Sequence, residues 1–202
     1  MNNRLRWSED MENTIKELKY RNHRLRHMQR YFDTKTLKIF GHGLIMSKLC
    51  SNLPAYGYRF LRFEESDPKN CLISQLQIEQ NEMMRTILKV KRQDKVSIES
   101  MLRTLNMCSV NQLIAKDTMM ETWKTLEFEI ESMYSTLNQR RGDRRENRGE
   151  NKHIHSRTKD PKSFPRIAEK LWNGAPAETK ETNLIEVAKK KITEYIKKII
   201  PV

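Results

Sequence analysis

Apolar residues recur at spacings of three and four along most of this chain, and this period constrains the fold more than any other feature. Such spacings place side chains on one face of an α-helix, whereas a half-buried strand alternates every second residue. In the first segment the apolar or small-amide positions are Ile15, Leu18, Asn22, Leu25, Met28 and Phe32. Glycine and proline number only 6 each, which disfavours a turn-rich β-sandwich or barrel. The period therefore predicts an all-α fold.

Helix boundaries follow from this period and from residues that cap helices. The expected helices before residue 138 span about 8–31, 33–49, 69–89, 97–105 and 109–137. Ser8, Asp33, Ser97 and Ser109 stand at their starts, where a side-chain oxygen can accept from a free backbone N–H. We expect residues 51–68 to form a loop. Because the connections are short, the sequence predicts an antiparallel bundle, with Trp123 buried in it.

The period is lost over residues 138–162, where charged residues are dense. Too little apolar surface is present there to offset chain entropy, so this segment is predicted to be disordered. Beyond it we expect a helix that ends near Asn173 and buries Trp172, and a last helix opened by an Asn183–Glu186 capping box. The stripe of that last helix is Leu184, Ala188, Ile192, Tyr195 and Ile199. The predicted organisation is a bundle (1–137), a disordered Arg-rich linker (138–162) and a two-helix tail (163–202).

The formal net charge of +13 is unevenly distributed. Residues 1–50 carry 11 basic and 5 acidic residues, as do residues 140–170, whereas the segment between them is close to neutral. Clustered positive charge favours a polyanion such as RNA, DNA or an acidic membrane face, and the alternative is a solvated surface. In the first helix Lys19, His23, Arg26 and Arg30 form one stripe. The residues predicted to bind nucleic acid are Lys19, Arg21, Arg24, Arg26, Arg30, Arg140, Arg141, Arg144, Arg145 and Arg148.

Motifs for catalysis and cofactor binding are missing from the sequence. It contains no GxxxxGK[ST], GxGxxG, HExxH or GxSxG pattern and no Asp-Asp pair. His153 and His155 lack nearby partners at metal-ligand spacing. We therefore expect no catalytic residue, no metal site and no cofactor. An enzymatic role would require that the chain complete another subunit's active site.

Cysteine usage and hydropathy bear on the compartment. Cys50, Cys71 and Cys108 are odd in number and far apart, which is typical of a reducing environment and predicts an intracellular protein, nuclear or cytoplasmic. No stretch of 18 apolar residues occurs, so we expect no membrane-spanning helix and no membrane partner.

Several short segments occur in an order typical of one protein family. They are Leu5-Arg6-Trp7, Gly43 to Leu49, Leu76-Gln77 with Gln80-Asn81, Met84 to Leu88, Ser109 to Leu113, Trp123-Lys124 and Ala168 to Asn173. In this order the chain resembles the C-terminal thumb and tail region of a non-LTR, jockey-like retrotransposon reverse transcriptase, an RNA-directed DNA polymerase. Tyr56-Gly57 is displaced relative to that pattern and no tryptophan follows it.

The resemblance has consequences for activity and partners. The fingers, the palm and the aromatic-x-Asp-Asp turn that carries catalysis in that family are missing from this sequence. The resemblance therefore implies a non-catalytic fragment that binds RNA or DNA of a template–primer kind. An alternative function is a helical protein-interaction module, whose partner would bind the last helix opposite Lys189, Lys190 and Lys197. Membrane-surface binding by this helix is less favoured, because Glu186 and Glu194 dilute its charge.

Overall fold

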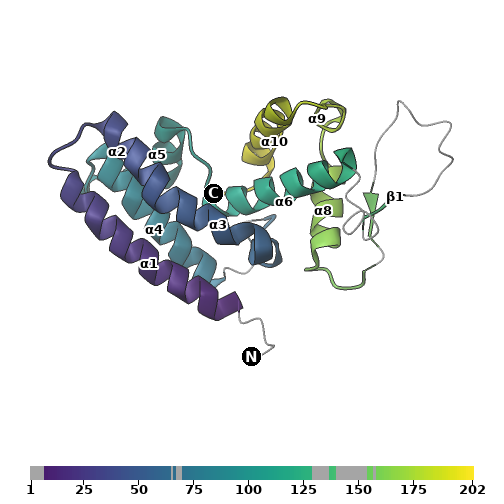
Figure 1. The fold of residues 1–202 in the computed structure, drawn as a ribbon, viewed down its shortest axis with the longest axis horizontal. Helices are drawn as coiled ribbons and strands as arrows, with labels where there is room; N and C mark the ends of the chain where they lie inside the picture. The colour runs from purple at the N-terminus through teal and green to yellow at the C-terminus, as the bar shows by residue number, and fades with distance from the viewer. Residues whose placement is uncertain (1–6, 65, 67–69, 129–136, 140–153, 157) are drawn as a thin grey trace.

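The computed structural model is mostly helical, as predicted, and describes residues 7–64, 66, 70–128, 137–139, 154–156 and 158–202 (Figure 1). Its longer helices are α1 (Trp7–Met28), α2 (Thr34–Gly41), α3 (Ser47–Tyr56), α4 (Cys71–Leu88), α5 (Ile98–Leu105), α6 (Val110–Glu127), α8 (Phe164–Asn173) and α10 (Ile185–Ile199). The shorter elements are the π-helix η1 (His42–Met46), the 3-10 helices η2 (Gly57–Phe60) and η3 (Arg92–Asp94), α9 (Ala177–Lys180), and the strands β1 (Asn138–Gln139) and β2 (Ile154–His155). No described helix is long and apolar enough to cross a bilayer.

The first half of the chain forms a bundle around α4. Helices α2, η1 and α3 form one continuous helical arm that runs back along α1. Arg21 of α1 donates to Leu44 O, and the earlier residue Glu17 pairs with the later residue Lys48, so the arm and α1 are antiparallel. Helix α4 then runs parallel to α1. The arm is thus antiparallel to both α1 and α4, whereas α1 and α4, the two helices that pack most extensively, are parallel (Figure 1).

Capping and burial define these helices largely as expected. Asp33, Ser97 and Ser109 accept hydrogen bonds from Thr36 N, Ser100 N and Gln112 N, so all three are confirmed as N-caps. Ser8 is not an N-cap, since α1 begins at Trp7 and Ser8 lies within its first turn.

The loop expected over residues 51–68 is wrong for most of its length. Helix α3 continues through Pro54 to Tyr56, and η2 follows to Phe60. Leu49 and Leu53 are spaced by one helical turn, and both are buried in the bundle core. Their burial outweighs the hydrogen bond that proline cannot donate.

Two apolar clusters share α6. The first contains buried residues of α1 to α5 and the start of α6, and the second contains the rest of α6 together with Leu137, Ile154, α8 and α10. Trp123 and Trp172 are each 1% exposed and lie in the second cluster, which confirms the predicted burial of both. Trp123 Nε1 donates to Thr182 O at 2.9 Å, and Gln112 Nε2 donates to Ile200 O at 3.0 Å, so the tail is bonded directly to α6.

The tail differs from its prediction in two details. Helix α10 buries Ala188, Ile192 and Ile196, whereas Leu184 is 70% exposed and Ile199 is also exposed. The predicted Asn183–Glu186 capping box is absent, because α10 begins after Leu184, which makes no side-chain cap. A strict spacing of four, rather than four and three, therefore defines the buried face.

The predicted disordered linker is structured at both described ends. Asn138 and Gln139 pair with His155 and Ile154 in an antiparallel ladder, and Ile154 is fully buried. Asn173 accepts from Ile154 N and donates to Ile154 O, which fastens β2 to α8. Disorder is thus wrong for residues 154–156 and 158–162, and Arg140, Arg141, Arg144, Arg145 and Arg148 lie outside the described residues.

Candidate nucleic-acid interface

The basic residues predicted on α1 occupy three sides of the helix. At about 100° per residue, the buried stripe of Leu18, Asn22 and Leu25 defines the inner side. Arg21 and Arg26 lie on opposite flanks next to neighbouring helices, although Arg26 is itself exposed. Lys19 and Arg24 are exposed further round the helix, and Arg30 is exposed in the turn after α1. The structure therefore does not bring all five together as one surface.

Arg26 is paired with α4. Its Nη2 lies 3.1 Å from Glu82 Oε2, and Glu82 also pairs with Arg85 at 3.1 Å and Arg92 at 2.9 Å. The Glu82 side chain is only 13% exposed, so one shielded carboxylate serves three guanidinium groups. Arg26 thus has a structural partner that the sequence prediction did not include.

Arg21 is engaged on the opposite flank. It pairs with Glu17, which also binds Lys48 of α3 at 2.7 Å, and it donates to the backbone oxygen of Leu44. The hydrogen bonds from Lys48 and Arg21 lower the pKa of Glu17, so this carboxylate is charged at neutral pH. Arg21 therefore joins α1 to the helical arm of α2 and α3.

Lys19, Arg24 and Arg30 have no ion-pair partner among the described residues. All three are exposed, and the Arg24 guanidinium lies 5.9 Å from the centre of the Tyr20 ring. This distance is typical of a weak cation–π contact, which leaves the guanidinium N–H groups open to other acceptors. These three cations are available to an anionic ligand.

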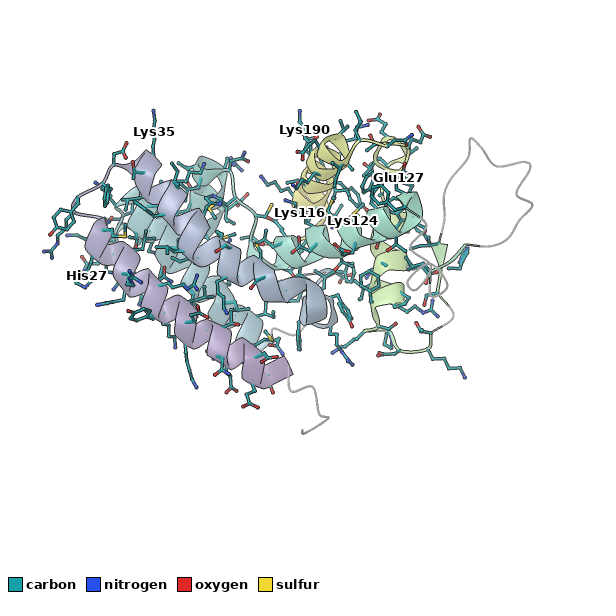
Figure 2. The ribbon with its side chains drawn as sticks, in the orientation of Figure 1. His27, Lys35, Lys116, Lys124, Glu127 and Lys190 are labelled. Carbon is teal, nitrogen blue, oxygen red and sulfur yellow. The ribbon has the colours of Figure 1, made fainter. Side chains whose placement is uncertain are left out.

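The strongest concentration of charge lies where α1 and α4 end. We call residues 24–38 and 82–95 the basic end; together they contain ten cationic and three acidic residues, a net charge of +7 out of +13 for the chain. Gln29 Nε2 donates to Thr86 O at 3.1 Å, which holds the two segments side by side. Figure 1 shows the last turns of α1 and α4 with the first turn of α2 at the end of the molecule far from α8, and Figure 2 shows His27 and Lys35 there.

Helix polarity explains part of this charge. The parallel packing of α1 and α4 places two helix C-termini, each with partial negative charge, at the same end, and cations there are stabilising. That effect is confined to the last turn of a helix. Lys35, at the start of α2, and Lys91 and Lys95, beyond the end of α4, lie outside both last turns and are exposed. These lysines are thus not required to balance the helix dipoles.

The sequence prediction missed the contribution of α4 and its following turn. Lys89, Lys91 and Lys95 belong to the segment KVKRQDK, a basic run that could have been recognised. The position of this run beside the end of α1 could not have been recognised. The sequence predicted a bundle, but it did not predict which helices in the bundle lie side by side. Lys89 caps α4 in the left-handed conformation with φ 58°, and its N–H donates to Arg85 O and Thr86 O.

A second cationic region lies along α6 facing α10. Two small hollows of about 190 and 230 Å³ share Lys116, and Lys124 and Lys189 also line the second. Figure 2 shows Lys116 and Lys124 on α6. Asp117 and Glu121 line the second hollow, so its charge is mixed. Burial raises the pKa of Asp117 to about 6. This region is less suited to a polyanion than the basic end.

Within the described part of the chain, no three His, Cys, Asp or Glu side chains form a group that could hold a metal ion. No protein-family model, curated protein or solved structure matches the sequence or the fold.

Proposed function

We propose that this chain is a non-catalytic helical module that binds the phosphate backbone of RNA or DNA through its basic end. The observation that carries the proposal is the convergence of two segments, 24–38 and 82–95, whose combined net charge is +7. A polyanion gains from such a cluster because each neutralised phosphate releases condensed counterions. Because these cations lie on two separate segments of the chain, they can contact phosphates at separate positions along the nucleic-acid backbone.

The expected contacts carry little sequence information. Lysine and arginine side chains that bind phosphate oxygens position a protein on nucleic acid without recognising its bases. Arg30, Lys35, Lys89, Lys91 and Lys95 are the residues we assign to this role, and Lys19 and Arg24 extend it along α1. The run from Arg140 to Arg148 would add further guanidinium groups.

The resemblance to the thumb and tail of a retrotransposon reverse transcriptase supports the same function. A fragment of this kind would retain contacts to a template–primer without the palm that performs polymerisation. We therefore propose a retroelement origin together with the binding function. A protein-interaction role for α10 has weaker support, because Ala188, Ile192 and Ile196 are packed against α6 and are unavailable to a partner.

Fluorescence anisotropy with a labelled duplex at several salt concentrations tests the proposal. If roughly six phosphates are engaged, the logarithm of affinity falls with the logarithm of salt at a slope of about −5. The affinity then drops by about 10³-fold between 50 and 200 mM salt. A flat salt response, or no binding at 50 mM salt to either the duplex or a single strand of the same length, would overturn the proposed function.

A further inference from the structure

The outer side of α1 carries aromatic rings among its cations. Lys16, Tyr20, His23 and His27 follow intervals of four, three and four, Arg24 lies next to His23, and all five lie opposite the buried stripe. All five are exposed, and Tyr20 retains 62% of its surface. Figure 2 shows His27 on the side of α1 that faces away from the bundle. Tyr31, in the turn after α1, is 80% exposed.

Four of these side chains form two contacting pairs. The Arg24 guanidinium lies over the Tyr20 ring at 5.9 Å from its centre. The His23 and His27 rings meet edge to face with centroids 4.5 Å apart, and their Nε2 atoms are 2.9 Å apart. Tyr20 and His27 are about 10 Å apart along the helix axis, at 1.5 Å per residue. Aromatic groups and cations thus alternate along one open face.

We propose that this face binds single-stranded nucleic acid, with bases stacking on Tyr20 and Tyr31 while Lys16, Arg24 and Arg30 contact phosphates. The inference rests on the proposed function and deepens it by naming the form of nucleic acid. Single-strand binding sites combine a cationic track with exposed aromatic rings, because every base has a face that can stack. In a duplex those faces are already stacked on neighbouring bases and cannot reach a tyrosine ring.

The matched variants are Tyr20→Ala and Tyr20→Phe. Phenylalanine keeps the ring face and loses only the hydroxyl, so it separates stacking from hydrogen bonding. Because Tyr20 is exposed, neither change removes core packing, and circular dichroism checks that both variants fold. Tyr31→Ala provides an independent test at the second ring.

The probes are a 15-nucleotide single-stranded DNA, the RNA of the same sequence, the DNA duplex, and an abasic strand with the same phosphates. We expect Tyr20→Ala to weaken single-strand binding by about 5- to 150-fold. The same variant should change duplex and abasic binding by less than about twofold, and Tyr20→Phe should bind as the wild type does. A difference between the DNA and RNA strands would show whether the sugar contributes.

The outcomes separate the two proposals. An equal loss on abasic and base-bearing strands, an unchanged affinity in Tyr20→Ala, or a Tyr20→Phe variant as weak as Tyr20→Ala would overturn base stacking. Salt-dependent binding would then still support the proposed function. No binding of the wild type to any of the four probes at low salt would overturn the proposed function itself.

Discussion

Arg26 on α1 and Glu82 on α4 form an ion pair with a distance of 3.1 Å between Nη2 and Oε2. The two residues are 56 positions apart and occupy parallel helices, so their contact fixes the register in which α1 and α4 end together. The same carboxylate holds Arg85 and Arg92. Glu82 therefore holds three guanidinium groups of the basic end in place, while the neighbouring lysines stay exposed.

Replacing Glu82 with glutamine should destabilise the fold and strengthen nucleic-acid binding. The variant leaves three arginines without their shared carboxylate, and we expect the free energy of unfolding to fall by about 1–3 kcal/mol. Urea titration measures this loss. The control is Glu99→Gln, because Glu99 pairs with Arg103 at the surface, where both side chains are mostly exposed, and such pairs contribute less than about 1 kcal/mol. Equal effects of the two substitutions would contradict the role of Glu82.

Two nearby glycines provide a matched pair for the packing of α2 on α4. A Cβ added at Gly41 would lie 2.8 Å from Ile87 Cδ1 and 3.3 Å from Met83 Sδ, whereas one added at Gly43 meets nothing within 4 Å. Gly43→Ala should stabilise the protein by about 0.5–1 kcal/mol, because alanine loses less chain entropy in a helix. Gly41→Ala should instead lose about 1 kcal/mol through overpacking. Thermal unfolding of both variants is the measurement, and stabilisation by Gly41→Ala would show that α2 does not approach α4 so closely.

Asp117 should make stability depend on pH. Burial raises its pKa from 3.8 to about 6, so between about pH 4 and 6 the folded protein keeps a proton that the unfolded chain has released. Stability contributed by this group is therefore present at low pH and is lost as the pH rises through about 6. Asp117→Asn should be more stable than the wild type at pH 7.5, by up to about 3 kcal/mol, and equally stable at pH 4. Urea midpoints across pH 4–8 check this, and equal midpoints at pH 7.5 would contradict it.

The sequence predicted local structure better than it predicted contacts between helices. The spacing of Leu18, Asn22 and Leu25 identified the buried side of α1, because that information lies within one helix. Pro54 misled the prediction of α3, since the burial of Leu53 against other helices decides the outcome there. The pairing of Arg26 with Glu82 could not be predicted, because nothing near either residue indicates which helix lies beside it.

For the candidate site, too, the sequence predicted which residues carry charge but not which of them the fold brings together. The charges of Arg30 and of the segment 89–95 are visible in the sequence, but their meeting depends on α1 and α4 being parallel. Conversely, Arg21 and Arg26 belong to a basic pattern that looked like a binding stripe, and each is engaged with a carboxylate. Periodicity locates a face of a helix, whereas only the packed structure tells which of its cations are already paired.

Helix α10 offers a direct test of which apolar residues form its buried face. Ile192 is fully buried in the apolar cluster that α10 forms with α6, whereas Leu184 is 70% exposed, although one predicted stripe contained both. Ile192→Ala should lower the free energy of unfolding by about 2–5 kcal/mol. Leu184→Ala should change it by less than about 0.5 kcal/mol. Guanidinium titrations of the two variants make the comparison, and a larger loss for Leu184→Ala would mean that α10 packs through its other side.

The proposed basis of nucleic-acid binding is the location of the positive charge, and not the net charge alone. Its most direct test compares two triple variants with the same change in net charge. One carries Arg30→Gln, Lys35→Gln and Lys89→Gln at the basic end, and the other carries Lys189→Gln, Lys190→Gln and Lys198→Gln on α10, where all three lysines are exposed. The measurement is the salt dependence of duplex binding for each.

Each phosphate contact contributes about 0.9 to the slope of log affinity against log salt. We predict that the basic-end variant reduces the slope from about −5 to about −2, while the α10 variant keeps the wild-type slope. Equal slopes for the two variants, or a loss confined to the α10 variant, would contradict the account.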